Sequence, residues 1–179
     1  HSALAIESLK NGKHVVVEKP LALNDKDAEK IFNLSRRMEK FVITDYTQTF
    51  SQGLNYLANS KLNIGKILSY EMRIGKMESL KNNQTNNVYW HLMPHLLSVL
   101  DMFESIDNFT FQRQSFVKNN DNIITTGLLV FEKGFLRASV DYPSKEFKVV
   151  LYGKKGTAIY SAVDDPTVRI TRRGNGGVV

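Results

Sequence analysis

The chain has 179 residues, of which 42% are hydrophobic, and its formal net charge is +6 at pH 7. This length supports one substantial core, or one domain together with part of another. The absence of cysteine excludes disulfides, thiolate zinc sites and cysteine nucleophiles. Because no apolar run reaches membrane-spanning length and the N-terminus shows no signal pattern, we predict a cytoplasmic protein without a membrane partner.

Basic residues are distributed along the chain, with 24 lysines and arginines among 18 acidic residues. Only Lys154 and Lys155 with Arg169, Arg172 and Arg173 form a local excess. No helix-turn-helix, zinc-finger or RNA-binding motif accompanies it, so we expect no nucleic-acid partner. The phosphates of a dinucleotide would explain a basic surface equally well.

The first 45 residues alternate helix and strand. Residues 2–10 are typical of a helix, and the valines at 15–17 predict a short buried parallel strand that stops at Pro20, which offers no ladder donor. Asn24 is a good N-cap for an amphipathic helix that ends near Lys40 and whose expected apolar stripe includes Ile31 and Phe32, and residues 41–44 predict a second strand. We interpret residues 1–45 as the C-terminal part of a dinucleotide-binding Rossmann domain, with the glycine-rich phosphate loop upstream of the printed sequence.

Residues 46–179 predict a different architecture. A weaker helix at 51–60, a strand within 65–75, a polar loop at 81–87 and a helix opening near Pro94 precede a region that is almost entirely β. Short turns there indicate an antiparallel sheet, so the fold class is α/β: part of a Rossmann-type domain, then an α+β domain with a large, mostly antiparallel open sheet. We expect helices to cover one face of this sheet, and we expect the other face to mediate contact between copies in a homo-oligomer. The expected strands are 109–117, 123–131, 135–142, 147–152, 157–160 and 167–171.

Two charges stand at the carboxyl end of the first strand, where open α/β sheets bind ligands. Glu18 and Lys19 therefore suit chemistry, although a solvated strand-end salt bridge is the alternative. The Lys19 ammonium could position a hydroxyl or carbonyl and stabilise developing charge on its oxygen. His95, at the start of an apolar helix, suits general acid/base work, although a structural role is its alternative.

His91 and Tyr46 are two further candidate site residues. His91 lies four residues before His95, a spacing that also suits a metal pair. Two ligands do not make a site, and no acidic neighbour completes one, so we predict no metal. Tyr46 follows the second strand, where a half-buried aromatic at a domain junction is the alternative to a binding role.

The segment Gly12 to Ala22, read as Gly-Lys-His-Val-Val-Val-Glu-Lys-Pro-Leu-Ala, resembles the signature of the glucose-fructose oxidoreductase, inositol dehydrogenase and rhizopine-catabolism (Gfo/Idh/MocA) oxidoreductase family. The resemblance continues through Phe50, Gly65-Lys-Ile, the helix opening at His95 and the segment Tyr152 to Thr157. It implies an NAD- or NADP-dependent dehydrogenase acting on a sugar, polyol or nucleotide-sugar. Which substrate, which cofactor and which direction are open.

The resemblance also implies residue roles. Lys19 would be the catalytic lysine that contacts the reacting oxygen and the nicotinamide, with Glu18 and Pro20 shaping the cofactor-binding loop around a Lys19-Pro20 bond that can be cis. His95 would be the catalytic acid/base. We expect His91, Tyr46 and Trp90 to bind substrate.

The chain departs from the family at several positions. Members usually carry an aspartate four residues before the histidine, where this chain has His91, and Gln48 and Thr49 replace arginines. The family's Gly-x-Gly-x-x-Gly loop is not in the printed sequence, so we expect this chain alone to bind dinucleotide weakly and to be inactive. The alternative hypothesis is a non-catalytic relative that acts as a cofactor sensor or scaffold.

Overall fold

The computed structural model describes residues 1–179 except 78–87, 107, 119–121, 164–165, 173 and 175–179. The chain divides into two compact units, residues 1–47 and 48–179. The expected polar loop at 81–87 and the basic residue Arg173 lie outside the described residues. Within the described part of the chain, no helix combines the length and apolar character that a bilayer crossing requires.

The first unit is two helices against a two-stranded parallel sheet. Strands β1 (Val15–Glu18) and β2 (Val42–Asp45) pair in register, with Val16 opposite Ile43 and Glu18 opposite Asp45. Helices α1 (Ser2–Lys10) and α2 (Asp25–Met38) pack on each other and on the strands. Its buried core consists of Ala5, Leu9, Val17 and Ile31.

Helix α2 begins and ends as its sequence dictates. The Asn24 side chain accepts a hydrogen bond from the Asp27 backbone N–H at 2.9 Å, so the predicted N-cap is confirmed. Its C-terminus is closed by Glu39 in the left-handed conformation (φ 52°), while the Lys40 N–H donates to Ser35 O. These caps satisfy backbone groups that a helix leaves unpaired.

Two expected buried side chains are exposed instead. Val16 is 72% exposed, because the helices in the described chain cover only the face that carries Val17. Phe32, predicted to lie in the apolar stripe of α2, is 55% exposed, and the Arg36 guanidinium lies over its ring, 4.7 Å from the centroid. Burial of the stripe falls on Ile31, whose side chain is fully buried.

The second unit is a seven-stranded sheet in the order β4-β5-β6-β3-β7-β8-β9. All neighbours pair antiparallel except β3 and β6, which are parallel. The predicted large, mostly antiparallel sheet is confirmed, and each described strand begins and ends within about two residues of its expected limits. The strands are β3 (Ile67–Gly75), β4 (Phe109–Lys118), β5 (Asn122–Phe131), β6 (Gly134–Val140), β7 (Glu146–Gly153), β8 (Gly156–Ser161) and β9 (Thr167–Arg172).

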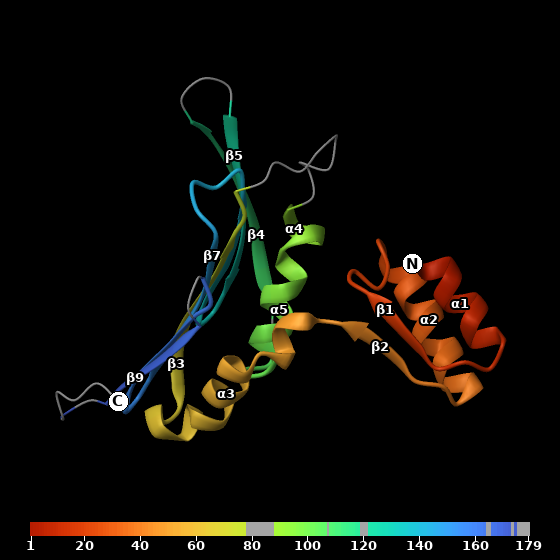
Figure 1. The fold of residues 1–179 in the computed structure, drawn as a ribbon, viewed down its shortest axis with the longest axis horizontal. Coiled ribbons are helices and arrows are strands. Elements are labelled where there is room, and N and C mark those ends of the chain that lie inside the picture. The colour runs from red at the N-terminus through yellow and green to blue at the C-terminus, as the bar shows by residue number, and fades with distance from the viewer. Residues whose placement is uncertain (78–87, 107, 119–121, 164–165, 173, 175–179) are drawn as a thin grey trace. The chain divides into compact units, whose positions relative to one another are not determined.

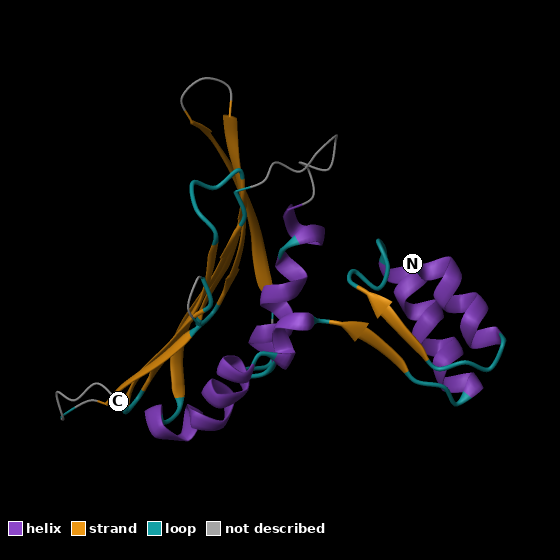
Figure 2. Ribbon diagram, in the orientation of Figure 1, coloured by secondary structure: helices purple, strands orange, loops and turns teal. Residues whose placement is uncertain are grey.

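One face of this sheet is covered by helices (Figures 1 and 2). Helix α3 (Gln52–Ile64), which follows a 3-10 turn (Thr47–Phe50), packs on β7, β8 and β9. Helices α4 (Val88–His91) and α5 (Met93–Asp101) pack on β3, β5 and β6. The core between helices and sheet is continuous and includes Leu57, Leu100, Met72, Leu136 and Val149. Helix α3 thus covers β8 and β9 at that end of the sheet.

Leu136 provides a direct test of this core. Its side chain is fully buried on β6, whereas Leu68 on β3 is 56% exposed. We expect Leu136→Ala to lower the free energy of unfolding by about 2–5 kcal/mol, because it leaves a cavity as well as losing apolar contact. Leu68→Ala, the same chemical change, should stay within about 0.5 kcal/mol of the parent.

Urea unfolding followed by tryptophan fluorescence measures both variants. Trp90 is the single tryptophan of the chain and belongs to the second unit, so its signal reports on that unit. Equal losses in the two variants would contradict the assigned packing of the helices on this face.

Candidate functional site

The carboxyl end of β1 is fixed by hydrogen bonds to the start of α1. The His1 ring Nδ1 lies 2.8 Å from the backbone oxygen of Glu18 and 3.1 Å from that of Pro20. Since a carbonyl oxygen only accepts, Nδ1 carries the proton and donates to both. The Lys19–Pro20 peptide bond is cis, as the resemblance suggested. Lys19 is therefore held on a loop whose two neighbouring residues are tied to one side chain.

The carboxyl ends of both parallel strands gather polar groups at one edge. Glu18 is exposed and lies opposite the half-buried Asp45, and Tyr46 follows with its N–H donating to Thr44 O at 3.0 Å. Lys19 and Tyr46 are both half-buried. This edge of an open α/β sheet is where such folds bind ligands. Among the described residues, no cluster of three or more potential metal ligands occurs.

The second group of expected residues lies on α4 and α5. Trp90 is 40% exposed and His91 half-buried on α4, while His95 is half-buried in the first turn of α5, one residue after Pro94. The His95 N–H donates to Leu92 O at 3.1 Å, and the Ser98 hydroxyl donates to His95 O at 2.9 Å. The start of α5 is therefore well anchored. Lys19 belongs to the first unit and His95 to the second.

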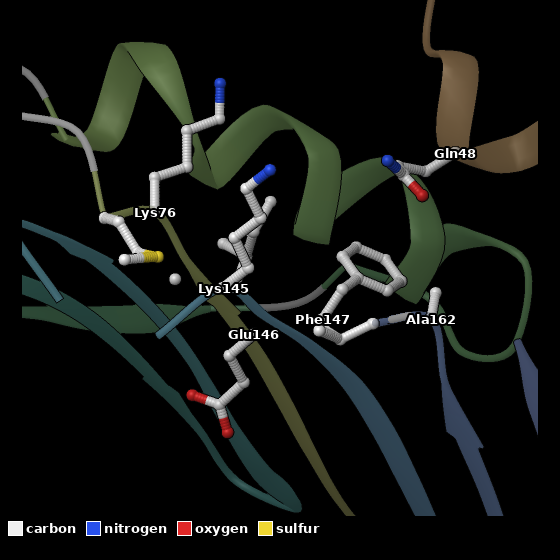
Figure 3. A pocket seen from close by; sticks show the side chains of 10 residues that line it. Gln48, Lys76, Lys145, Glu146, Phe147 and Ala162 are labelled. Carbon is white, nitrogen blue, oxygen red and sulfur yellow. The ribbon is translucent and has the colours of Figure 1, made fainter. Parts of the chain in front are cut away.

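A cavity of about 460 Å³ opens in the second unit, where β3 ends and β7 begins. Phe147 and Ile74, both buried, supply apolar surface, and Lys76, Lys145 and Gln48 supply polar groups. Figure 3 shows Lys76 and Lys145 extending to the same side of the sheet, with Glu146 pointing to the other. Sequence reasoning did not single out these lysines, because β3 and β7 are far apart in the chain.

The sheet face opposite the helices carries a network of charges. Arg73 Nη2 lies 2.6 Å from Glu71 Oε2, and Arg137 Nη2 lies 2.6 Å from Glu146 Oε2. The Tyr152 hydroxyl donates to Glu71 Oε1 at 2.9 Å. This hydrogen bond to a carboxylate, with a smaller contribution from burial, raises the pKa of Tyr152 above its ordinary value.

Residues 1–46 match the family model GFO_IDH_MocA, described as the oxidoreductase family with an NAD-binding Rossmann fold. The predicted resemblance is thus confirmed over this N-terminal part, which contains Glu18, Lys19 and Pro20. No curated protein matches the chain.

Solved structures share the fold over the whole chain. UDP-N-acetylglucosamine 3-dehydrogenase from Acidithiobacillus ferrooxidans is 18% identical with a TM-score of 0.76, and the match covers 100% of this chain and 59% of that protein. Biliverdin reductase from Synechocystis sp. PCC 6803, solved with biliverdin and NADP+, is 20% identical with a TM-score of 0.76 and coverages of 100% and 61%. A 3-ketoreductase from Actinomadura kijaniata, solved with TDP-benzene and NADP, is 16% identical with a TM-score of 0.75 and coverages of 100% and 60%.

These similarities place the chain in a structural class. It has the α/β fold of NAD(P)-binding oxidoreductases, and it spans about six tenths of the length of the structures it matches. Because the sequence identities lie between 16% and 20%, these structures establish the fold of this chain and do not identify its substrate.

The Tyr152 hydrogen bond predicts opposite effects for two neighbouring substitutions. Glu71→Gln should lower the pKa of Tyr152 toward its ordinary value of 10.0, because the carboxylate that favours the protonated hydroxyl is removed. Arg73→Gln should raise the pKa further, since Arg73 favours the phenolate. Nuclear magnetic resonance of the Tyr152 ring across alkaline pH measures both, and shifts of the same sign would contradict the assignment.

The raised pKa of Tyr152 determines how its hydrogen bond to Glu71 changes the free energy of unfolding with pH. A group that holds its proton more tightly in the folded state stabilises that state fully below its unfolded pKa. The contribution of the Tyr152–Glu71 bond should therefore be present below about pH 10 and disappear as the pH rises through the raised pKa.

Proposed function

We propose that the chain is part of an NAD- or NADP-dependent oxidoreductase that transfers hydride between the nicotinamide and the hydroxyl- or carbonyl-bearing carbon of a sugar, polyol or nucleotide-sugar. The observation that carries the proposal is Lys19 on its anchored loop at the carboxyl end of β1, within the segment that matches the family. The named activities of the structural neighbours, a nucleotide-sugar dehydrogenase and a 3-ketoreductase, support the substrate class.

The residues of this chain fit the nicotinamide end of such a cofactor. Lys19 is half-buried on its loop at the ligand-binding edge of a parallel sheet, directly after Glu18, which is paired with Asp45. The printed sequence has no Gly-x-Gly-x-x-Gly segment, so the fit proposed for these residues concerns the nicotinamide end of the cofactor and leaves out its pyrophosphate. A bound nicotinamide would supply the hydride acceptor or donor at its C4.

The two proposed catalytic side chains divide the remaining work. During oxidation, His95 accepts the hydroxyl proton at Nε2, since its Nδ1 is buried, while the hydride leaves the carbon that bears the oxygen. The Lys19 ammonium stabilises the negative charge that develops on that oxygen. In the reverse direction, His95 returns the proton. We propose that Glu18 and Pro20 shape the loop, and that Tyr46, Trp90 and His91 contact the substrate.

One observation favours a second candidate function. His91 stands where the family usually has an aspartate, and an imidazolium there would oppose a positive charge on His95. A non-catalytic relative that binds cofactor as a sensor or scaffold would tolerate this change. Cofactor binding without turnover of any sugar or polyol would favour this second function.

The catalytic assignment predicts the effect of two substitutions. In a polypeptide that carries the glycine-rich loop as well as this chain, Lys19→Ala and His95→Ala should each reduce kcat by about 10²-fold or more. Turnover is measured with a panel of sugars, polyols and nucleotide-sugars by the absorbance of NADH or NADPH.

His14→Ala provides the control. His14 lies outside β1, its ring stacks on Phe41, and its Nδ1 accepts from the Phe41 N–H at 3.0 Å. This substitution should keep kcat near the parent value, and His95→Ala should keep NADH fluorescence enhancement and the Trp90 spectrum. Undiminished turnover in the Lys19 and His95 variants would disprove the catalytic assignment.

We also propose that a second copy of this chain binds the sheet face opposite the helices. That face carries Glu71 and Glu146 next to Arg73 and Arg137, so a two-fold contact can oppose unlike charges. Ile159 on β8, which is half-buried and pairs with the buried Val150 on β7, adds an apolar side chain to that face.

Ile159→Glu should therefore convert a dimer to a monomer, because it buries a carboxylate in the contact. The same substitution at Ile106, which is 42% exposed between α5 and β4, should leave the dimer intact. Size-exclusion chromatography with light scattering measures the mass. A parent protein that is monomeric, or equal behaviour of both variants, would contradict this contact.

A further inference from the structure

Two lysine side chains give positive charge to the wall of the cavity at the end of β3. Lys76 and Lys145 both line it, and the acidic lining residue is Glu146. No ion pair to either lysine occurs among the described residues. A concave site with one sign of charge concentrates ligands of the opposite sign.

Strand geometry keeps Glu146 away from these lysines. Successive residues of a strand point to opposite faces, so Lys145 and Phe147 lie on the helix side and Glu146 on the other (Figure 3). There its carboxylate is 2.6 Å from Arg137 Nη2 and 4.0 Å from Arg73 Nη1. Among the described residues that line the cavity, the acidic side chain is therefore paired with two guanidinium groups on the other face.

The backbone around the cavity is fixed before any ligand arrives. The Lys76 N–H donates to Ser139 O at 3.0 Å, and Lys76 O accepts from the Tyr142 N–H at 2.9 Å. On the opposite wall, the Ala162 N–H donates to Phe147 O at 3.0 Å. Lys76 therefore extends from an anchored backbone, and Lys145 lies two residues before the anchored Phe147, so the cost of ordering Lys76 on binding falls mainly on its side chain.

The surroundings of the charges suit a small organic molecule. The volume of about 460 Å³ is typical of small-molecule sites, and Phe147 and Ile74 provide apolar surface next to the ammonium groups. The Gln48 amide, which also lines the cavity, can donate or accept a hydrogen bond to a hydroxyl. Such a site combines contact with the body of a ligand and recognition of an anionic end.

We propose that this cavity binds the phosphate or carboxylate group of a small polyhydroxylated ligand, with Lys76 and Lys145 as the binding residues. We assign this ligand as the substrate of the oxidoreductase, and this assignment rests on the proposed function. The substrate class is thereby narrowed from sugars and polyols in general to their phosphorylated or acidic derivatives.

Binding to the full 179-residue chain tests the proposal without cofactor. Isothermal titration calorimetry at low ionic strength compares glucose 6-phosphate, gluconate, inorganic phosphate and neutral glucose. We expect at least one of the two anionic sugars to bind about tenfold or more tightly than glucose, since a charged hydrogen bond contributes this much. The better of the two identifies the anion as phosphate or carboxylate, and added salt should weaken its binding.

Three matched variants locate the site. Lys76→Met and Lys145→Met, which keep most of the side-chain stem, should each weaken the preferred anion about tenfold and leave glucose unchanged. Lys148→Met removes the same charge from β7 and serves as the control. Lys148 stands between Phe147 and Val149, whose side chains are buried in the helix-side core, so the Lys148 side chain lies on the other face of the sheet. This control variant should keep the parent affinity.

The possible results separate this inference from the proposed function. Equal affinity for glucose and both anionic sugars, binding of inorganic phosphate alone, or equal losses in all three variants would overturn the cavity assignment. The anion could bind with the expected variant pattern and yet not be oxidised by a polypeptide that oxidises neutral sugars. This result would overturn the assignment of the ligand as the substrate. Turnover that is lost in the Lys19 variant and unaffected at Lys76 and Lys145 would leave the proposed function standing and this inference refuted.

Discussion

The position of β3 within the sheet determines most of the second unit. The strand hydrogen-bonds to β6 in parallel on one side and to β7 in antiparallel on the other, so it joins two sets of consecutive antiparallel strands into one sheet. The parallel contact is so close that a Cβ on Gly134 would lie 2.0 Å from Tyr70 O. The same insertion pairs Gly75 with Glu146 and thereby brings Lys76 and Lys145 to one cavity.

Local pattern predicted the elements of this fold well. Alternation and turn residues located the strands from 109 onward, because each antiparallel neighbour follows directly in the sequence. The parallel pairing of β3 with β6 was not predicted, since nothing in residues 67–75 specifies a partner that lies some sixty residues downstream. Val16 was wrongly expected to be buried, because burial depends on how many layers cover a strand and three consecutive valines do not report it.

The two sets of site residues differ in how far sequence reveals them. Lys19 stands out because it carries a charge at the carboxyl end of an expected parallel strand, and the family match covers that segment. The roles of Lys19 and His95 stay predictions, as do those of His91, Tyr46 and Trp90. Lys76 and Lys145 carry no motif, and their proximity follows from long-range pairing. Only the order Lys145-Glu146-Phe147 held a clue, since alternation in a strand separates the acid from both of its neighbours.

Strand β9 lies at one edge of the sheet in the part of the chain that the structure describes. An edge leaves backbone N–H and C=O groups ready to pair with another strand, which is a common route to aggregation. Here Arg169 and Arg172 are exposed along that edge, and Arg172 is held by a hydrogen bond to Asn63 Oδ1 at 3.1 Å. Edge-to-edge pairing of two such described sheets would bring these like charges together, which opposes that pairing.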